Sequence, residues 1–344
     1  MQMKYILSFF KIIFAGVIAV AILCGIFAMY YTVPVHISNP NENTDYIWPA
    51  NSVWCQMTEG ISWGKYDAKG YNNRKVMENP DVVILGSSHM EATNVLQTEN
   101  VGHLLSEKLD GEYSVYNMGI SGHTLIKICK YLPATLALYE EEPSFIVMET
   151  STTNLQKDSV DALLEGTVDF TPSHDSGLIA TLQKFPFFRV TYKQIKDGLL
   201  DLLLPEKTTQ TKPTQTKPAQ VASTGNKTNN EEVYDAFFTY IDDVMKDSST
   251  QLIIVYHPSA VLQEDGSVIF IPDEGNALFS EKCQEHGIAF VDMTEPFAEL
   301  FASDYKLPHG FITGAIGSGH LNADGHAAMA QELAECITEL RQGD

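Results

Sequence analysis

The chain has 344 residues, of which 44% are hydrophobic and 19% are charged, so it has enough apolar material for at least one globular core. Lysine and arginine total 22 against 44 aspartates and glutamates, which gives a formal net charge of -22. This balance excludes an electrostatic nucleic-acid binder, because contacts with phosphate need clustered cations.

The first predicted element is a membrane-spanning helix. An apolar run at residues 12–31 contains no charge and no proline, and it is long enough to cross a bilayer. Lys4 and Lys11 precede the run without any acidic residue, which places the N-terminus in the cytoplasm and the remainder outside. The run is longer than the apolar region of most cleaved signal peptides and lacks a small-residue cleavage site. We therefore expect an uncleaved signal-anchor.

The five cysteines show neither a disulfide framework nor a metal-ligand spacing. Cys24 lies in the predicted span. Cys129 and Cys336 lie within apolar helical patterns, where a buried free thiol is expected.

Beyond a mixed segment that follows the anchor, strands alternate with helices. Apolar runs bounded by turn residues predict strands at 82–85, 114–117, 145–149, 251–256 and 288–292. Helical patterns lie at 97–109, 124–141, 231–247, 277–286 and 322–340. This order predicts an α/β fold, a three-layer sandwich with a mainly parallel sheet and helices on both faces.

Two stretches interrupt the alternation. Residues 205–230 are rich in Thr, Lys, Gln and Pro and have almost no apolar side chains, so a disordered loop insertion is expected there. Residues 261–276 are expected to form a small hairpin or excursion.

Four glycine-rich or polar segments follow strands or precede the last helix: 86–89, 117–124, 149–154 and 317–326. The carboxyl ends of parallel strands meet at one edge of a sheet, where ligands bind. A serine hydroxyl becomes a nucleophile when an imidazole takes its proton, and the resulting oxyanion needs N–H donors. The four segments contain these groups and thus indicate acyl-transfer chemistry.

The same segments resemble the sequence blocks of the SGNH (GDSL-like) hydrolase family. The matching stretches are Gly86-Ser87-Ser88, Asn117-x-Gly119-x-x-Gly122-x-Thr124 and His320-Leu321-Asn322-x-x-Gly325. The resemblance covers about residue 80 to the C-terminus without the insertion. It implies an SGNH/flavodoxin-like fold.

The resemblance also implies a role for particular residues. Ser88 is the nucleophile by position, with Ser87 in place of the usual Asp, and His320 is the general base. The backbone N–H groups of Ser88 and Gly119 serve the oxyanion, together with Asn154 as the loose equivalent of the third block.

The acid behind the histidine is left open. The family usually has an Asp three residues before its histidine, and Gly317 stands at that position here. Asp304 or a backbone carbonyl would then orient His320, or the enzyme would operate as a dyad.

Several of these residues also have plain structural interpretations. Ser87 is expected to be a turn or cap residue. Ser121 does not form a Gly-x-Ser-x-Gly elbow, because His123 replaces the last glycine. His326 is expected to cap or pack on the last helix, and His89 and His123 are expected to line the pocket at strand ends without acting. His257 either contacts substrate or is a satisfied loop histidine. The spacing of His320, Asp324 and His326 fits no common zinc site.

Together these observations predict a membrane-anchored, extracytoplasmic serine esterase or acyltransferase without cofactor or metal. It would add or remove acyl groups, acetyl above all, on a carbohydrate or cell-envelope polymer, with a membrane acyl-donor protein as a further partner. The alternative is a catalytically inactive SGNH-like binding or scaffold component, which the missing acid at Gly317 favours. The expected organisation is a cytoplasmic N-terminus (1–11), an anchor (12–33), an irregular membrane-proximal segment (34–79) and a hydrolase domain (80–344).

Overall fold

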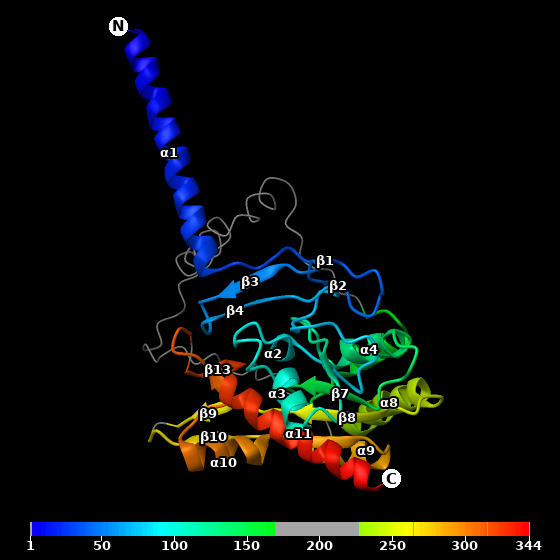
Figure 1. The fold of residues 1–344 in the computed structure, drawn as a ribbon. Helices are drawn as coiled ribbons and strands as arrows, with labels where there is room; N and C mark the ends of the chain where they lie inside the picture. The colour runs from blue at the N-terminus through cyan, green and yellow to red at the C-terminus, as the bar shows by residue number, and fades with distance from the viewer. Residues whose placement is uncertain (1, 169–226, 264, 315, 344) are drawn as a thin grey trace.

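A five-stranded parallel sheet forms the centre of the computed structural model, which describes residues 2–168, 227–263, 265–314 and 316–343 (Figure 1). Its strand order is β11-β8-β7-β5-β6, and every neighbouring pair is parallel. The strands are β5 (Val82–Leu85), β6 (Val115–Asn117), β7 (Phe145–Thr150), β8 (Gln251–Tyr256) and β11 (Ala289–Asp292). The sequence alternation thus predicted the sheet correctly.

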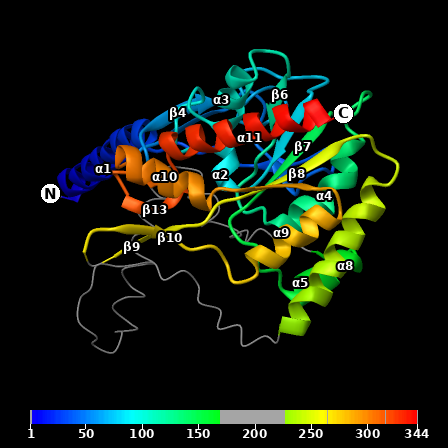
Figure 2. The ribbon, with the colours of Figure 1, turned by 90° about the horizontal axis from the view of Figure 1, so that it is seen from below.

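Helices cover both faces of this sheet (Figures 1 and 2). On one face, Val83 and Ile254 share a core with α4 (Leu125–Leu136), α8 (Lys227–Met245) and α9 (Asn276–Glu285). On the other face, Val82 and Val255 share a core with α3 (Val101–Lys108), α10 (Thr294–Asp304) and α11 (Ala323–Gly343). The short α5 (Lys157–Leu164) contacts α4 and α8. Because all four residues of β5 are buried, its unbroken apolar run shows no alternation.

Local capping sets the helix boundaries. α3 begins after Asn100, whose side chain accepts the N–H of His103, and not at residue 97 as predicted. α4 begins after its N-cap, Thr124, and ends at Leu136, five residues before the predicted end. The helix α10 was not predicted from the sequence.

The two predicted interruptions have different outcomes. β9 (Ala260–Leu262) and β10 (Val268–Phe270) form the expected antiparallel hairpin. The first turn of α8 occupies residues 227–230, where the insertion was predicted to continue. Residues 205–226 of that predicted insertion lie outside the described residues.

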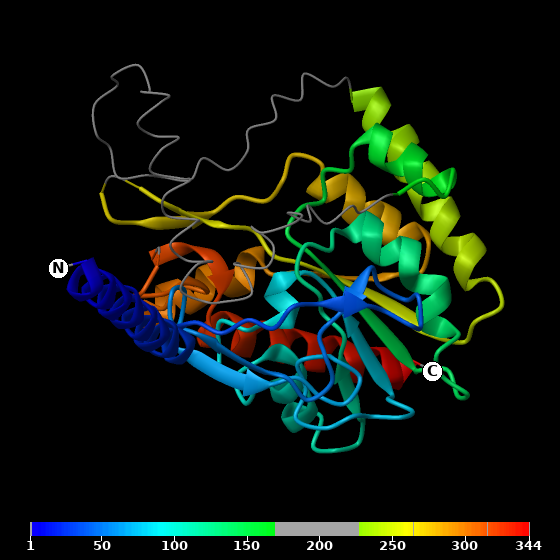
Figure 3. The same ribbon diagram turned by 90° about the horizontal axis from the view of Figure 1, so that it is seen from above.

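The N-terminal part has more regular structure than the sequence predicted. α1 (Gln2–Tyr30) contains a stretch, Tyr5–Tyr30, that is long and apolar enough to cross a membrane and is not buried against the domain. Residues 34–79 form two antiparallel pairs instead of an irregular segment: β1 (Ile37–Ser38) with β2 (Tyr46–Ile47), and β3 (Val53–Gln56) with β4 (Ser62–Lys65). Trp54 and Tyr66 are buried in this region, so an apolar core holds it on the domain (Figure 3).

The described cysteines are all free. Cys129 is buried, as expected, whereas Cys336 is half-buried.

Candidate active site

The turn after β5 places Ser88 at the carboxyl edge of the sheet. Ser87 is the N-cap of α2 (Ser88–Glu91), and its hydroxyl accepts the N–H of His89 at 3.2 Å. The N–H of Ser87 donates to Oε2 of Glu149 at 2.7 Å. The interpretation of Ser87 as a cap is therefore confirmed, and the cap directs Ser88 into the first position of the helix.

The loop after β6 lies directly against α2. A Cβ atom on Gly119 would lie 2.4 Å from the backbone nitrogen of Glu91, so only glycine permits this approach. Asn117 joins the two segments, because its amide nitrogen donates to the carbonyl of Met90 at 2.6 Å while its Oδ1 accepts the N–H of Gly119 at 2.9 Å. The asparagine and glycine of this motif thus fix the position of α2.

A bulge in the last hairpin presents His320. β12 (His309–Gly310) pairs with β13 (Ile316–Leu321), but the register shifts between the two residues of β12. His309 faces Leu321 and Gly310 faces Ile316, so the intervening residues of β13 project from the ladder. Bulges commonly re-aim side chains next to active sites, and this one directs His320 toward α2.

Ser88, His320 and Glu59 form a continuous hydrogen-bonding and ion-pair chain. The Oγ of Ser88 lies 2.9 Å from Nε2 of His320. On the other side of the ring, Nδ1 lies 2.9 Å from Oε2 of Glu59. The second carboxylate oxygen, Oε1, accepts the backbone N–H of His320 at 2.9 Å. The carboxylate favours the tautomer with hydrogen on Nδ1, which leaves Nε2 free to accept the serine proton.

Glu59 comes from the loop between β3 and β4, in the segment that follows the anchor. Its carbonyl accepts the side-chain amide of Asn94 at 2.8 Å, and the N–H of Gly60 donates to Oγ1 of Thr313 at 2.9 Å. Asp304 does not take the position of the acid. It is the exposed last residue of α10, and Glu59 already lies at the ring nitrogen that Asp304 was expected to contact.

Of the predicted oxyanion donors, only the backbone N–H of Ser88 lies at the site without donating a hydrogen bond to another described residue. That N–H is at the first position of α2. The N–H of Gly119 is already bonded to Asn117. Asn154 is exposed, and its side-chain oxygen lies against Gly275, with no described contact to Ser88.

A second carboxylate–imidazole pair supports the turn that carries Ser88. Oε1 of the fully buried Glu149 lies 2.8 Å from Nε2 of His257, and both side chains are 1% exposed. Burial alone would raise the pKa of Glu149, but hydrogen bonds from His257 and from the Ser87 N–H hold it below its ordinary value. Glu149 therefore stays ionised and ties β7, the loop after β8 and the nucleophile turn together.

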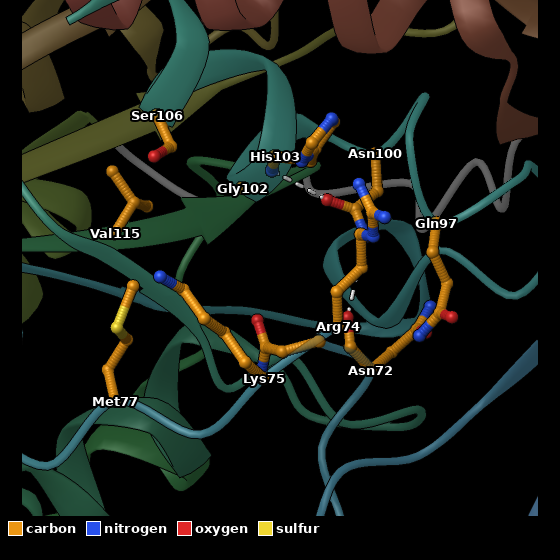
Figure 4. A pocket seen from close by; sticks show the side chains of 11 residues that line it. Asn72, Arg74, Lys75, Met77, Gln97, Asn100, Gly102, His103, Ser106 and Val115 are labelled. Carbon is orange, nitrogen blue, oxygen red and sulfur yellow. Dashed lines mark hydrogen bonds between the residues drawn. The ribbon is translucent and has the colours of Figure 1, made fainter. Parts of the chain in front are cut away.

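Two cavities differ in their position relative to this site. One of about 360 Å³ has Gly60, Asn94 and Asn322 in its wall; Gly60 directly follows Glu59, and Asn322 is two residues after His320. The other, of about 410 Å³, lies between α3 and residues 72–77, with Arg74 and Lys75 on its wall (Figure 4). It reaches Val115 at the amino end of β6, whereas Ser88 follows the carboxyl end of β5. Neither cavity is lined by Ser88 or His320.

A hydroxyl, an imidazole and a carboxylate in this order are the groups that serine hydrolases use to activate a nucleophile. The site therefore has the parts of a serine acyl-transfer centre at the edge where α/β sheets bind ligands.

No protein-family model and no curated protein matches this sequence. Among solved structures, the chain is similar to a candidate arylesterase from Agrobacterium tumefaciens (13% identity, 76% of this chain and 99% of that chain, TM-score 0.36). It is also similar to a variant of the acetylxylan esterase Axe2 from Geobacillus stearothermophilus (12% identity, 76% and 94%, TM-score 0.39). A third is a peptidoglycan O-acetylesterase (11% identity, 67% and 47%, TM-score 0.31). Similarities of this size carry no argument about activity, which depends here on the site itself.

Two carboxylates of the site had no functional assignment from the sequence. Glu59 lies outside the four segments, and Glu149 begins the third segment without an assigned role. Only the position of Glu149 at a strand end was a usable signal, because a carboxylate directly after an apolar run faces the ligand edge of a sheet.

Proposed function

We propose that this protein is a membrane-anchored serine esterase or acyltransferase of the SGNH type. Ser88 is the nucleophile, His320 the general base and Glu59 the acid of the triad. The observation that carries the proposal is the 2.9 Å contact between Ser88 Oγ and His320 Nε2, with Glu59 at 2.9 Å behind the ring.

The reaction proceeds in two displacements. Ser88 Oγ attacks the ester carbonyl while its proton moves to Nε2 of His320, and the N–H of Ser88 stabilises the oxyanion. Collapse breaks the bond to the leaving alkoxide, which takes the proton from Nε2 and leaves an acyl group on Ser88. Water or a sugar hydroxyl then gives its proton to Nε2 and attacks the acyl carbon. The bond between that carbon and Ser88 Oγ breaks, and Nε2 returns the proton to Oγ. Glu59 stabilises the imidazolium that forms in each displacement.

The anchor and the site together suggest where the substrate lies. The apolar stretch Tyr5–Tyr30 has Lys4 just before it and Lys11 near its start. These positive charges at its N-terminal end support a cytoplasmic N-terminus and an extracytoplasmic domain. An acylated carbohydrate or cell-envelope polymer is then the expected substrate, and acetyl the expected group. A membrane acyl-donor protein would serve as the partner if the reaction is transfer and not hydrolysis.

The inactive-scaffold alternative has lost its main support. It followed from the absence of an acid at Gly317, and the carboxylate of Glu59 now lies where that acid is needed. Residue 317, the usual position of the acid in the sequence, is an uncharged glycine, but the Glu59 carboxylate lies beside Nδ1 of His320.

The test uses the full chain in detergent micelles, a chromogenic acetyl ester and a fluorophosphonate probe. Wild type is expected to turn over the ester and to be labelled at Ser88, and Ser88→Ala is expected to abolish both. The matched control is Ser87→Ala, which removes the neighbouring hydroxyl and a helix cap but retains labelling of Ser88. Turnover that survives Ser88→Ala, or a folded wild-type chain that the probe does not label, would overturn the proposal.

A further inference from the structure

Three imidazole rings gather beside the triad from distant parts of the chain. His89 belongs to α2, His257 follows β8 and His309 lies on β12. One ring nitrogen of each lies within 4.8 Å of the corresponding nitrogens of the other two. His257 and His309 are 1% and 2% exposed, and His89 is half-buried. No sequence spacing relates these residues, so only the fold reveals the cluster.

The hydrogen-bond pattern directs one lone pair of His257 into the cluster. Glu149 holds the hydrogen of His257 on Nε2, so the lone pair of that ring is on Nδ1. This Nδ1 lies 3.5 Å from Nε2 of His309, with which it shares a long hydrogen bond that a bound ion would replace. Two nitrogens bound to one tetrahedral zinc ion, each at 2.0–2.1 Å, lie about 3.3 Å apart. A carboxylate behind a histidine is also the usual outer partner of a ligating imidazole.

One ring nitrogen of the cluster has no partner. Among the described residues, Nδ1 of the buried His309 has no hydrogen-bond partner, and the same holds for both ring nitrogens of the fully buried His326, outside the cluster. A buried polar group without a partner is destabilising.

We propose that His89, His257 and His309 form a binding site for a divalent transition-metal ion of the zinc class, with water in the fourth position. The carboxylate of Glu149, which contacts His257 on the far side of its ring, supplies negative charge that compensates the charge of the ion. His89 Nδ1 now accepts the N–H of Leu321 at 3.2 Å. For His89 to bind the ion through its other nitrogen, Nδ1 must take the proton, and the bond to Leu321 must break. Metal binding therefore changes a backbone contact of Leu321, the residue that follows His320.

The experiment titrates chelator-stripped full chain in detergent with Zn²⁺ against a chromophoric chelator, at neutral pH. One ion per chain is expected, and His257→Gln or His309→Gln should weaken binding at least tenfold. Glu149→Gln, which keeps the size of the side chain, should weaken it about 10- to 100-fold. The control is His103→Gln, a histidine on α3 outside the cluster, which should leave the affinity unchanged.

Two outcomes would overturn the proposal. One is a folded wild-type chain that takes up no Zn²⁺, and the other is equal Zn²⁺ affinity in wild type and the cluster variants. If the variants unfold, the visible absorption spectrum of Co²⁺ bound to wild type replaces the comparison, because tetrahedral Co²⁺ absorbs visible light much more strongly than octahedral Co²⁺. Weak octahedral bands alone would then refute the three-histidine site.

A separate observation concerns the outward face of the β3–β4 hairpin. Cys55 faces Trp63 across the ladder, so Val53, Cys55 and Trp63 share one face, with Ile61 two residues before Trp63. Val53 and Ile61 are each 61% exposed and Trp63 is 59% exposed. The opposite face carries the buried Trp54, so large apolar side chains lie on both faces of this hairpin, and Lys65, opposite Val53, is the charged residue of the outward face.

The hairpin is attached to the end of the anchor helix (Figures 1 and 3). The backbone of Thr32, two residues after α1, exchanges hydrogen bonds of 2.9 and 2.8 Å with Cys55. The thiol of Cys55 also donates to the carbonyl of Met29 at 3.4 Å. The exposed apolar face therefore starts where the apolar stretch of α1 ends.

We infer that this face lies in the interfacial layer of the bilayer, where tryptophan side chains are enriched. The inference depends on the membrane anchor of the proposed function. Because the loop of the same hairpin carries Glu59, it also places the triad close to the lipid surface, within reach of a membrane-bound acyl donor or a lipid-linked polymer.

The three tryptophans of the chain make this testable. Trp48 and Trp54 are 7% and 2% exposed, so only Trp63 can meet lipid. Full chain in nanodiscs of brominated phosphatidylcholine should show quenched emission relative to ordinary lipid, and Trp63→Phe should remove the quenched component. Trp48→Phe is the control and should retain it. Equal emission in both lipids, with the chain still in the nanodisc, would refute the contact without touching the esterase proposal, whereas a chain absent from the nanodisc would refute the anchor.

Discussion

Glu59 is the residue whose removal tests the triad most directly. Glu59→Gln keeps an oxygen for the backbone N–H of His320 but removes the negative charge beside Nδ1. Two unit charges about 4 Å apart interact by about 4 kcal/mol at an effective dielectric constant near 20. At 1.36 kcal/mol for each factor of ten, the imidazolium of the transition state loses stabilisation equal to roughly a thousandfold in kcat.

The assay is hydrolysis of a chromogenic acetyl ester by full chain in detergent, with the rate of Ser88→Ala subtracted. Glu59→Asp should recover part of the rate, because it restores the charge on a side chain shorter by one methylene. Asp304→Asn is the matched control and should keep the wild-type rate, since Asp304 is exposed at the end of α10. Glu59→Gln with more than about a third of the wild-type kcat, or a large loss in Asp304→Asn, would refute the reasoning.

Three further predictions concern the surroundings of the site. Gly319→Ala should lower kcat more than tenfold, because its Cβ would lie 2.4 Å from Oε1 of Glu59 at a φ of +87°, whereas Gly314→Ala, with only ordinary contacts, should not. Asn154→Ala should change ester hydrolysis less than about threefold, since the side chain is exposed, and a loss of thirtyfold or more would restore it as an oxyanion donor. Burial lowers the pKa of His123 to about 4, so between pH 6.5 and 5 the unfolded chain binds a proton there that the native chain does not. The free energy of unfolding should fall by about 2 kcal/mol over that interval, and chemical denaturation of His123→Gln should show a correspondingly flatter pH dependence.

The parts of the fold that could be predicted are those that depend on residues close together in the sequence. The run of β5 reads as a strand buried on both faces because each of its four residues is apolar, and it is buried. Ser87 was identified as a cap because a serine directly after a strand and before a helix satisfies an N–H of the first turn. Ser88 and His320 followed from a family resemblance on blocks that each lie within one loop.

The acid was not predictable in this way, because 261 residues separate Glu59 from His320. Glu59 is one of 44 acidic residues, and it lies in a segment whose mixed composition predicted irregular structure. Its place depends on the β3–β4 pairing and on contacts with Asn94 and Thr313, neither of which has a local sequence signal.

The shape of the β13 bulge explains why the carboxylate comes from outside it. Gly317, at the position where the family that the sequence blocks resemble has its Asp, has a φ of +77°, a conformation that costs an L side chain about 1 kcal/mol or more. Gly319 has a φ of +87° and leaves the space that Oε1 of Glu59 fills. An Asp at 317 would strain the bulge, and any Cβ at 319 would displace Glu59. Of the two glycines of this bulge, Gly317 therefore stands in place of the usual acid, and Gly319 admits the replacement. Since Glu59 comes from the hairpin joined to the end of α1, the proposed triad requires the anchor-proximal segment to be seated on the domain.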